Sequence, residues 1–156
     1  MLVLKTLPDA ACLIQPDAPL EFQLLFRLRW EMLRKPWGLP PGSEQDAEEE
    51  HTLHRAILRA ADVPEMLACG RIQETEPGLA QVRYMAVDQR FHGKGYGMEV
   101  LRSLEEAAWS FPGCRQIFLN ARENALGFYL KAGYRLDTEI EPYLGIRHFR
   151  MLRELG

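Results

Sequence analysis

The segment "VDQRFHGKGYGMEVL", from Val87 to Leu101, contains residues suited to binding an anionic group. Three glycines stand at every second position with two basic residues beside them: Arg90, Gly93, Lys94, Gly95 and Gly97. Glycine permits positive φ in a tight turn and leaves no side chain to hold a phosphate away. The first N–H groups of a following helix lack partners within the helix and carry partial positive charge. The segment therefore predicts a phosphate-binding turn built mainly from main-chain N–H groups.

This glycine pattern differs from two common phosphate-binding motifs. The GxxxxGK[ST] pattern of a P-loop is absent. The third-glycine spacing of a Rossmann turn is absent too, and no strand opens the chain in the right place for one. What remains is [Q/R]-x-x-G-x-[G/A], matched by Arg90, Gly93 and Gly95. Taken alone, this motif also fits a glycine-rich turn that simply precedes a helix.

The residues around the glycines predict a β-α-β unit. Leu79–Val87 is the strongest strand pattern in the chain. Tyr96–Phe111 has one apolar helical stripe and is stopped by Pro112 and Gly113. Gln116–Asn120 is a short apolar run expected to be a buried strand. Because a crossover helix joins parallel strands, we expect these two strands to be parallel.

The other predicted elements complete one mixed sheet. They are strands at Leu2–Leu7, Leu53–Ala60 and Glu65–Gln73, helices at Glu21–Leu33 and Ala125–Ala132, and a final strand pair at Tyr134–Ile140 and Arg147–Leu152. Short turns join most neighbouring strands, which are therefore expected to be antiparallel. The prediction is an α/β (α+β) fold with a mixed, mostly antiparallel sheet and helices on both faces. Residues 1–156 are enough for one domain and too few for two of ordinary size.

Composition excludes several classes of protein from the prediction. A formal net charge of −3 without a clustered basic segment argues against nucleic acid as a partner. No apolar run approaches the roughly 20 residues that span a membrane, and the N-terminus lacks a signal-peptide pattern. Cys12, Cys69 and Cys114 are far apart and form no CxxC pair, so they read as reduced, mostly buried thiols. We expect a cytoplasmic protein without a metal site; a catalytic cysteine has no partner pattern to support it.

A second segment, "NARENALGFYLKAGY" from Asn120 to Tyr134, follows about 30 residues later. Together with the glycine motif and the strand "AQVRYMAV", it resembles the GNAT superfamily of acetyl-CoA-dependent N-acyltransferases. The likeness includes the order of the predicted elements and so covers most of the chain. The stretch "FRLRWEMLRKPWGLPPGSEQD" is similar to the small bacterial ElaA and YitI branch of that superfamily.

The resemblance implies a sheet that opens into a V beside the glycines, with acetyl-CoA bound there. Residues expected to contact the cofactor are Met85, Ala86 and Val87 along the strand, Arg90, Gly93, Lys94, Gly95, Tyr96, Gly97 and Met98 at the turn, and Asn120, Asn124 and Phe128 beyond it. Asn124 also fits a residue that simply starts a helix. Tyr129 stands where the family often places a general acid. Since Phe128 and Tyr129 cannot both point inward, Phe128 is the better core candidate and Tyr129 the better catalytic one.

Acetyl transfer to an amine also needs a base, because a free alkyl ammonium has a pKa near 10.4. The family often places a carboxylate on the strand before the glycines, but Leu79–Val87 contains Arg83 and no Asp or Glu. The nearest alternatives are Glu50, His51, His54 and water chains. The acidic run Asp46–Glu50 that includes the first of these is expected to be a solvated helical turn.

The acceptor side is expected beyond the first helix. The loop Arg34–Gly38 contains Trp37, which fits either a lid or a core residue, and His148 on the last strand pair could reach the same mouth. Arg34, Lys35 and Arg83 around this mouth would favour a carboxylate-bearing acceptor. The predicted function is acetyl transfer from acetyl-CoA to a primary amine of a small molecule or peptide, by a monomer or a homodimer. The alternatives are a CoA-binding regulatory or sensing module and a partner-binding subunit.

Overall fold

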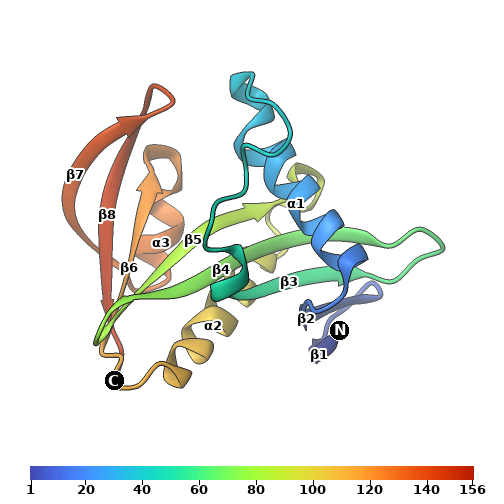
Figure 1. Cartoon of the computed structure of the whole chain (residues 1–156), viewed down its shortest axis with the longest axis horizontal. Helices are drawn as coiled ribbons and strands as arrows, with labels where there is room; N and C mark the ends of the chain where they lie inside the picture. Colours follow the sequence, from blue (N-terminus) through green and yellow to red (C-terminus); the bar gives the residue numbers. More distant parts are fainter.

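A single eight-stranded sheet organises the computed structural model, which describes residues 1–156 (Figure 1). The strands are β1 (Leu2–Thr6), β2 (Ala11–Gln15), β3 (Leu53–Arg59), β4 (Glu65–Glu76), β5 (Leu79–Val87), β6 (Gln116–Arg122), β7 (Arg135–Tyr143) and β8 (Ile146–Glu154). Their order across the sheet is β1-β2-β3-β4-β5-β6-β8-β7. Only β5 and β6 are parallel, and every other neighbouring pair is antiparallel, which confirms the predicted mixed sheet.

Helices cover both faces of the sheet, as predicted. Helix α1 (Pro19–Leu33) packs on one face, where Leu25 and Leu28 join a small buried cluster. Helices α2 (Tyr96–Ala107) and α3 (Leu126–Lys131) lie on the other face against the larger cluster. Short 3₁₀ turns connect these elements at Lys35–Trp37, Glu49–His51, Gln89–Phe91, Ala108–Ser110 and Glu123–Ala125. No helix is long and apolar enough to cross a membrane.

The sheet separates between β5 and β6. The two strands pair only from Leu79 opposite Gln116 to Gln81 opposite Phe118. Beyond Gln81 they diverge, and Figure 1 shows β6, β7 and β8 splaying away from β5 with α3 in the opening. The edge of β5 that faces β6 therefore has no partner strand from Val82 to Val87.

A β-bulge bends β5 at the start of this opening. Ala86 pairs with Cys69 and Arg83 with Arg71, so Tyr84 and Met85 together face Gly70. Tyr84 has a φ of 55°, a left-handed conformation uncommon for a bulky residue. Gly70 is needed opposite the bulge because a Cβ there would lie 2.5 Å from Met85 Sδ and 2.9 Å from Leu104 Cδ1.

Some elements differ from the sequence prediction. Strand β2 is not predicted at all, because Ala11–Gln15 is short, lies between prolines, and is buried without an inside–outside alternation. Strand β6 continues to Arg122, and both strands of the last hairpin extend further than predicted. Helix α2 ends at Ala107 and tightens into a 3₁₀ turn before Phe111.

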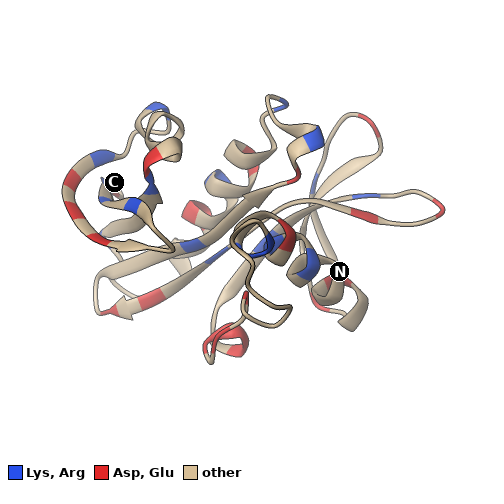
Figure 2. Ribbon diagram, turned by 90° about the horizontal axis from the view of Figure 1, so that it is seen from above, with Lys and Arg blue, Asp and Glu red and all other residues tan.

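Figure 2 shows Lys and Arg interspersed with Asp and Glu over most of the helices and strands.

Candidate active site

A cavity of about 530 Å³ occupies the opening between β5 and β6. The end of α1 and the segment after it, α3, and the β7–β8 hairpin form the rest of its wall. Of the residues singled out in the sequence, the cavity brings together Arg34, Arg83, Met85, Asn120, Tyr129 and His148. These side chains come from five different parts of the chain, so the divergence of the two strands creates the site.

The glycine turn lies at the start of α2, immediately after β5. Gly93 and Gly95 have φ of 82° and 84°, and a Cβ at either position would meet nothing within 4 Å. The only backbone hydrogen bond made to this turn is from Glu99 N–H to Gly95 O, 3.0 Å. The N–H groups of residues 93 to 98 donate to no backbone or side-chain group, so they form an open cluster of donors.

Gly97 has a different role from the two glycines before it. A Cβ at this position would lie 3.3 Å from the Phe128 ring and 3.3 Å from Val87 Cγ2. Glycine thus allows the first turn of α2 to pack against both α3 and the end of β5. This contact places the open N–H cluster next to the mouth of the gap.

The two basic residues of the motif behave differently. Arg90 forms a bidentate contact with Asp88, with Nη2 3.0 Å from Oδ2 and Nε 3.2 Å from Oδ1. Its charge is therefore directed to a carboxylate and not to the turn. Lys94 is exposed and has no carboxylate partner; its Nζ lies 5.9 Å from the centre of the Phe91 ring.

Main-chain groups of β5 face the gap. Asp88 N–H donates to Leu67 O of β4 at 2.8 Å, so the preceding residue, Val87, directs its N–H and carbonyl to the opposite side. The Val87 carbonyl accepts a hydrogen bond of 2.9 Å from His92 Nε2. Met85 and Val87 are half-buried beside the gap, whereas Ala86 points to the α1 face and joins its core.

The predicted roles of Phe128 and Tyr129 in packing are reversed. Tyr129 is only 7% exposed and belongs to the main core, whereas Phe128 is half-buried and packs on it edge-to-face at 5.0 Å. The Tyr129 ring also contacts the cavity, and burial raises the pKa of its hydroxyl group. Because the short helix α3 packs against the sheet through this position, Tyr129 is both a core residue and a wall of the site.

The two asparagines of the second motif lie in different surroundings. Asn120 is on β6 and lines the cavity. Asn124 is exposed in the 3₁₀ turn Glu123–Ala125, lies outside the cavity wall, and its side chain makes no hydrogen bond within the chain. A role in starting the helix by side-chain capping is therefore not observed for Asn124.

The predicted base candidates do not line the cavity. Glu50 and His51 are exposed in the 3₁₀ turn Glu49–His51, just before β3. His54 is buried, and its Nε2 lies 3.0 Å from Glu49 O. Burial is the main cause that lowers the pKa of His54.

The prediction that Asp46–Glu50 is a solvated turn is wrong for Asp46 and Glu49. Asp46 accepts from Arg71 at 2.8 and 2.6 Å, and Glu49 accepts from Arg29 at 2.9 and 3.0 Å. Both arginines are fully buried. Hydrogen bonding from Arg71 lowers the pKa of Asp46 to about 2. This network lies against the Tyr84 ring at the bulge and supports the shape of the site.

The residues expected on the acceptor side lie only partly in the cavity wall. Arg34 and Arg83 line it, but Lys35 is directed to the Trp30 ring. Trp37 is 39% exposed, and the Arg122 guanidinium lies 4.4 Å from its ring centre. His148 is 8% exposed within the cavity wall.

Comparison with known proteins identifies the family. The sequence profile of the Acetyltransferase (GNAT) family matches residues 22–134, well over half of the chain. The chain belongs to the GNAT acetyltransferase family. It is an acyltransferase of the GNAT type, and the gap between β5 and β6 lies within the matched region.

Individual proteins are similar to this chain in sequence or in fold. The uncharacterized N-acetyltransferase YjcF of Bacillus subtilis (strain 168) is 29% identical over 130 residues, covering 83% of this chain and 89% of YjcF. The crystal structure of Escherichia coli ElaA has a TM-score of 0.73 at 20% identity and covers 92% of this chain and 99% of ElaA. An aminoglycoside 6′-N-acetyltransferase complexed with coenzyme A has a TM-score of 0.73 at 16% identity, covering 91% of this chain and 96% of that enzyme.

Sequence reasoning did not single out several polar residues of the cavity between β5 and β6, among them Tyr84, Arg122, Glu141 and Tyr143. Their place in the wall follows from two features that the sequence did not predict. Tyr84 lies at the bulge of β5, and Arg122 lies in the part of β6 beyond its predicted end. Glu141 and Tyr143 belong to the part of β7 beyond its predicted end. The sequence does contain a signal for the burial of Arg29, because this charged residue falls in the apolar helical stripe of α1.

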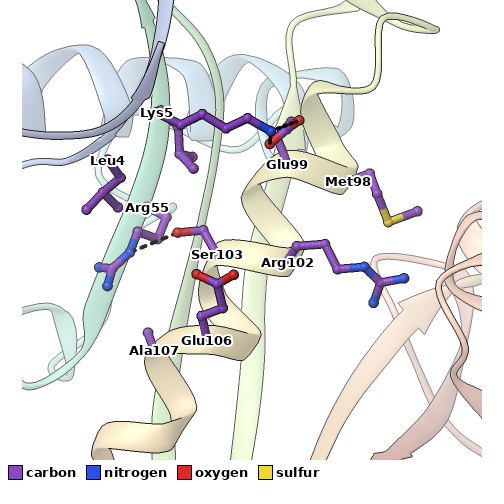
Figure 3. Close-up of a pocket in the computed structure, with 10 residues that line it drawn as sticks. Leu4, Lys5, Arg55, Met98, Glu99, Arg102, Ser103, Glu106 and Ala107 are labelled. Carbon is purple, nitrogen blue, oxygen red and sulfur yellow. Dashed lines mark hydrogen bonds and ion pairs between the residues drawn. The ribbon is translucent and has the colours of Figure 1, made fainter. Parts of the chain in front are cut away.

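A second cavity, of about 650 Å³, lies between α2 and the strands β1, β2 and β3 (Figure 3). One ion pair joins two of its charged side chains, with Lys5 Nζ 2.9 Å from Glu99 Oε1. Arg55 Nε donates to Ser103 Oγ at 3.2 Å. Neither of the diverging strands β5 and β6 contributes to this second cavity.

Proposed function

We propose that residues 1–156 act as one domain that transfers an acetyl group from acetyl-CoA to a primary amine of a small molecule or peptide. One observation carries the proposal. Six consecutive N–H groups without partners, from Gly93 to Met98, stand next to a strand edge that is free from Val82 to Val87. The first feature suits a diphosphate, and the second suits an extended chain that contains amides.

The proposed binding mode assigns each feature one part of coenzyme A. Main-chain N–H groups at the start of α2 hold the diphosphate, with added positive charge from Lys94. Met85 offers backbone groups to the pantetheine arm, as a neighbouring strand would, and the N–H of Val87 remains for the thioester. The coenzyme A bound by the aminoglycoside acetyltransferase of the same fold supports the use of an acyl-CoA.

Tyr129 is the proposed proton donor. Its ring lines the gap, and burial raises the pKa of its hydroxyl group, so the phenol keeps its proton at neutral pH. A neutral phenol can donate this proton to a leaving thiolate. The N–H of Val87, which faces the gap, is the proposed donor that stabilises negative charge on the thioester oxygen.

His148 is the proposed proton acceptor for the attacking amine. Its Nδ1 lies 2.8 Å from Ile146 O, and because a carbonyl only accepts, Nδ1 carries the ring proton. The Nε2 atom is then unprotonated and has no hydrogen-bond partner within the chain. Imidazole can accept a proton near neutral pH, and His148 replaces the carboxylate that β5 lacks.

The proposal is tested in two stages. Thermal unfolding with and without acetyl-CoA should show stabilisation by the ligand. Release of free thiol is then measured with a panel of primary amines for the wild type and His148→Gln. We expect the variant to bind CoA normally and to lose about 10²-fold or more in turnover near pH 7, with the loss shrinking at high pH as free amine accumulates. Stabilisation by acetyl-CoA without thiol release for any amine would favour a sensing module.

A further inference from the structure

The acceptor end of the cavity carries an excess of positive charge. Arg34, Arg83 and Arg122 line it, and Glu141 is the only acidic side chain in its wall. Arg83 Nη1 lies 3.4 Å from Asp46 Oδ2, so its charge is partly compensated. Neither Arg34 nor Arg122 forms an ion pair with any carboxylate in the chain, and these two residues hold the uncompensated charge.

The two guanidinium groups converge on one atom. Arg34 Nη1 and Arg122 Nη2 each donate to the carbonyl oxygen of Leu33 at 3.0 Å. Arg34 Nε also donates to Ser43 O at 3.2 Å. Two cations that share a single neutral acceptor repel each other, and the pKa of Arg122 is lowered by its burial and by the charge of Arg34. An anion placed between them would relieve that repulsion.

Burial makes the missing carboxylate unusual for this protein. Arg34 is only 7% exposed, and buried charges are normally paired. The fold supplies acids to its other deeply buried arginines: Arg29 has Glu49, and Arg71 has Asp46. The absence of an acid at the cavity wall therefore points to a partner that comes from outside the chain.

Aromatic side chains hold both groups in place. The Arg34 guanidinium lies 5.4 Å from the centre of the Tyr143 ring, and that of Arg122 lies 4.4 Å from the centre of the Trp37 ring. Arg34 Nη2 and Arg122 Nε and Nη1 have no hydrogen-bond partner within the chain. The wall thus presents preoriented N–H donors on two guanidinium groups, and the planar fork of each group suits an oxyanion.

We propose that Arg34 and Arg122 bind the carboxylate of the acceptor, so that the preferred acceptor is an amino carboxylate and not a simple amine or polyamine. This inference rests on the proposed acyl transfer at the same site. The carboxylate lies at the α1 and β7–β8 end of the cavity, and the amine points into the gap toward His148 and Tyr129. This proposal agrees with the sequence prediction of a carboxylate-bearing acceptor. The residue that binds the carboxylate together with Arg34 is now Arg122 and not Lys35.

The test compares acceptors that differ only in the anionic group. Each pair consists of an amino acid and the amine left after removal of its carboxylate, such as phenylalanine with phenethylamine and lysine with cadaverine. β-Alanine with 2-aminoethylphosphonate distinguishes a carboxylate from a phosphonate. We expect the wild type to prefer the amino carboxylate by about 10- to 100-fold in kcat/KM, the range for hydrogen bonds to a charged group.

Variants assign this preference to the two arginines. Arg122→Gln and Arg34→Gln should raise KM for the amino carboxylate by about 10- to 100-fold relative to KM for the carboxylate-free amine, so that the preference disappears. Arg122→Lys keeps the charge and should retain part of the preference. Arg150→Gln is the matched control, because Arg150 lies on β8 against the Phe118 ring, outside the cavity. Thermal unfolding establishes that each variant is folded.

Several outcomes would overturn the inference without touching acyl transfer itself. These are equal use of the amine and the amino acid by the wild type, preference for the phosphonate, or a preference that survives in both glutamine variants. If no amine is acetylated, calorimetry of amino acids binding to the CoA-saturated protein gives the answer. Binding that Arg122→Gln weakens at least tenfold supports the carboxylate site, and no binding, or binding equal in both proteins, rejects it.

Discussion

Replacing Gly95 by alanine should separate the cost of backbone strain from the loss of cofactor binding. Gly95 has a φ of 84°, and a Cβ there would meet no atom of the protein within 4 Å. The variant therefore pays only for a left-handed conformation, about 1–2 kcal/mol. For a chain of this size, that corresponds to a fall in Tm of about 2–8 °C. No steric clash adds to the cost.

The same substitution should also weaken coenzyme A binding. This effect should be separate from the loss of stability and larger in its consequence. The new methyl group would stand where a diphosphate oxygen approaches the N–H cluster, and loss of one hydrogen bond to a charged group weakens binding about 10- to 100-fold. At a CoA concentration of about 100 times the wild-type Kd, the wild type gains about 2.7 kcal/mol of stability. A variant that binds 100-fold more weakly gains only about 0.4 kcal/mol at the same concentration.

Gly113→Ala provides the matched control. Gly113 has a φ of 71°, and a Cβ there also meets nothing within 4 Å, but this residue follows α2 at the opposite end of the helix. Both variants should lose similar stability without ligand in thermal unfolding. Only Gly95→Ala should lose the stabilisation by CoA, and calorimetry should give the same ranking of Kd. If Gly95→Ala keeps the full CoA shift, the assignment of this turn to the diphosphate is refuted.

Three further variants test other parts of the account. Tyr129→Phe should keep its Kd for CoA and lose about 10²-fold or more in turnover at neutral pH, and wild-type turnover would contradict the proton-donor role. Gly70→Ala should lower the free energy of unfolding in urea by about 1–3 kcal/mol through overpacking on Met85, and adding Met85→Ala should restore part of it. Asp46→Asn should cost about 2 kcal/mol at pH 7, because Arg71 holds the Asp46 pKa at about 2. That carboxylate contributes fully above its unfolded pKa of 3.8, so the difference from wild type should shrink as pH falls from 3.8 toward 2, and a constant difference would refute the assignment.

Features that are formed by one segment of the chain could be predicted from the sequence. The glycine turn and the β-α-β unit around it depend on residues within about 40 positions of each other, and the strand, turn and helix signals agree there. The parallel pairing of β5 and β6 followed from that connection alone. The buried thiols were also predictable: Cys69 and Cys114 are buried, and burial raises the pKa of Cys69 to about 11.

Features that depend on segments far apart in the sequence could not be predicted in this way. Whether Phe128 or Tyr129 faces inward is decided by how a six-residue helix docks on the sheet, and two adjacent aromatics give no periodicity to distinguish them. Asp46 looks solvated in the sequence because its partner, Arg71, lies 25 positions away on β4. Arg34 and Arg122 are 88 positions apart and meet only through the carbonyl of Leu33.

A crystal structure of the complex with coenzyme A tests the central claim most directly. The account predicts diphosphate oxygens about 2.7–3.2 Å from the main-chain nitrogens of residues 93 to 98. It also predicts the pantetheine arm along β5 in the gap that β6 leaves. Coenzyme A bound elsewhere, for example in the cavity between α2 and β1, with the turn at Gly93 and Gly95 unoccupied, would contradict it.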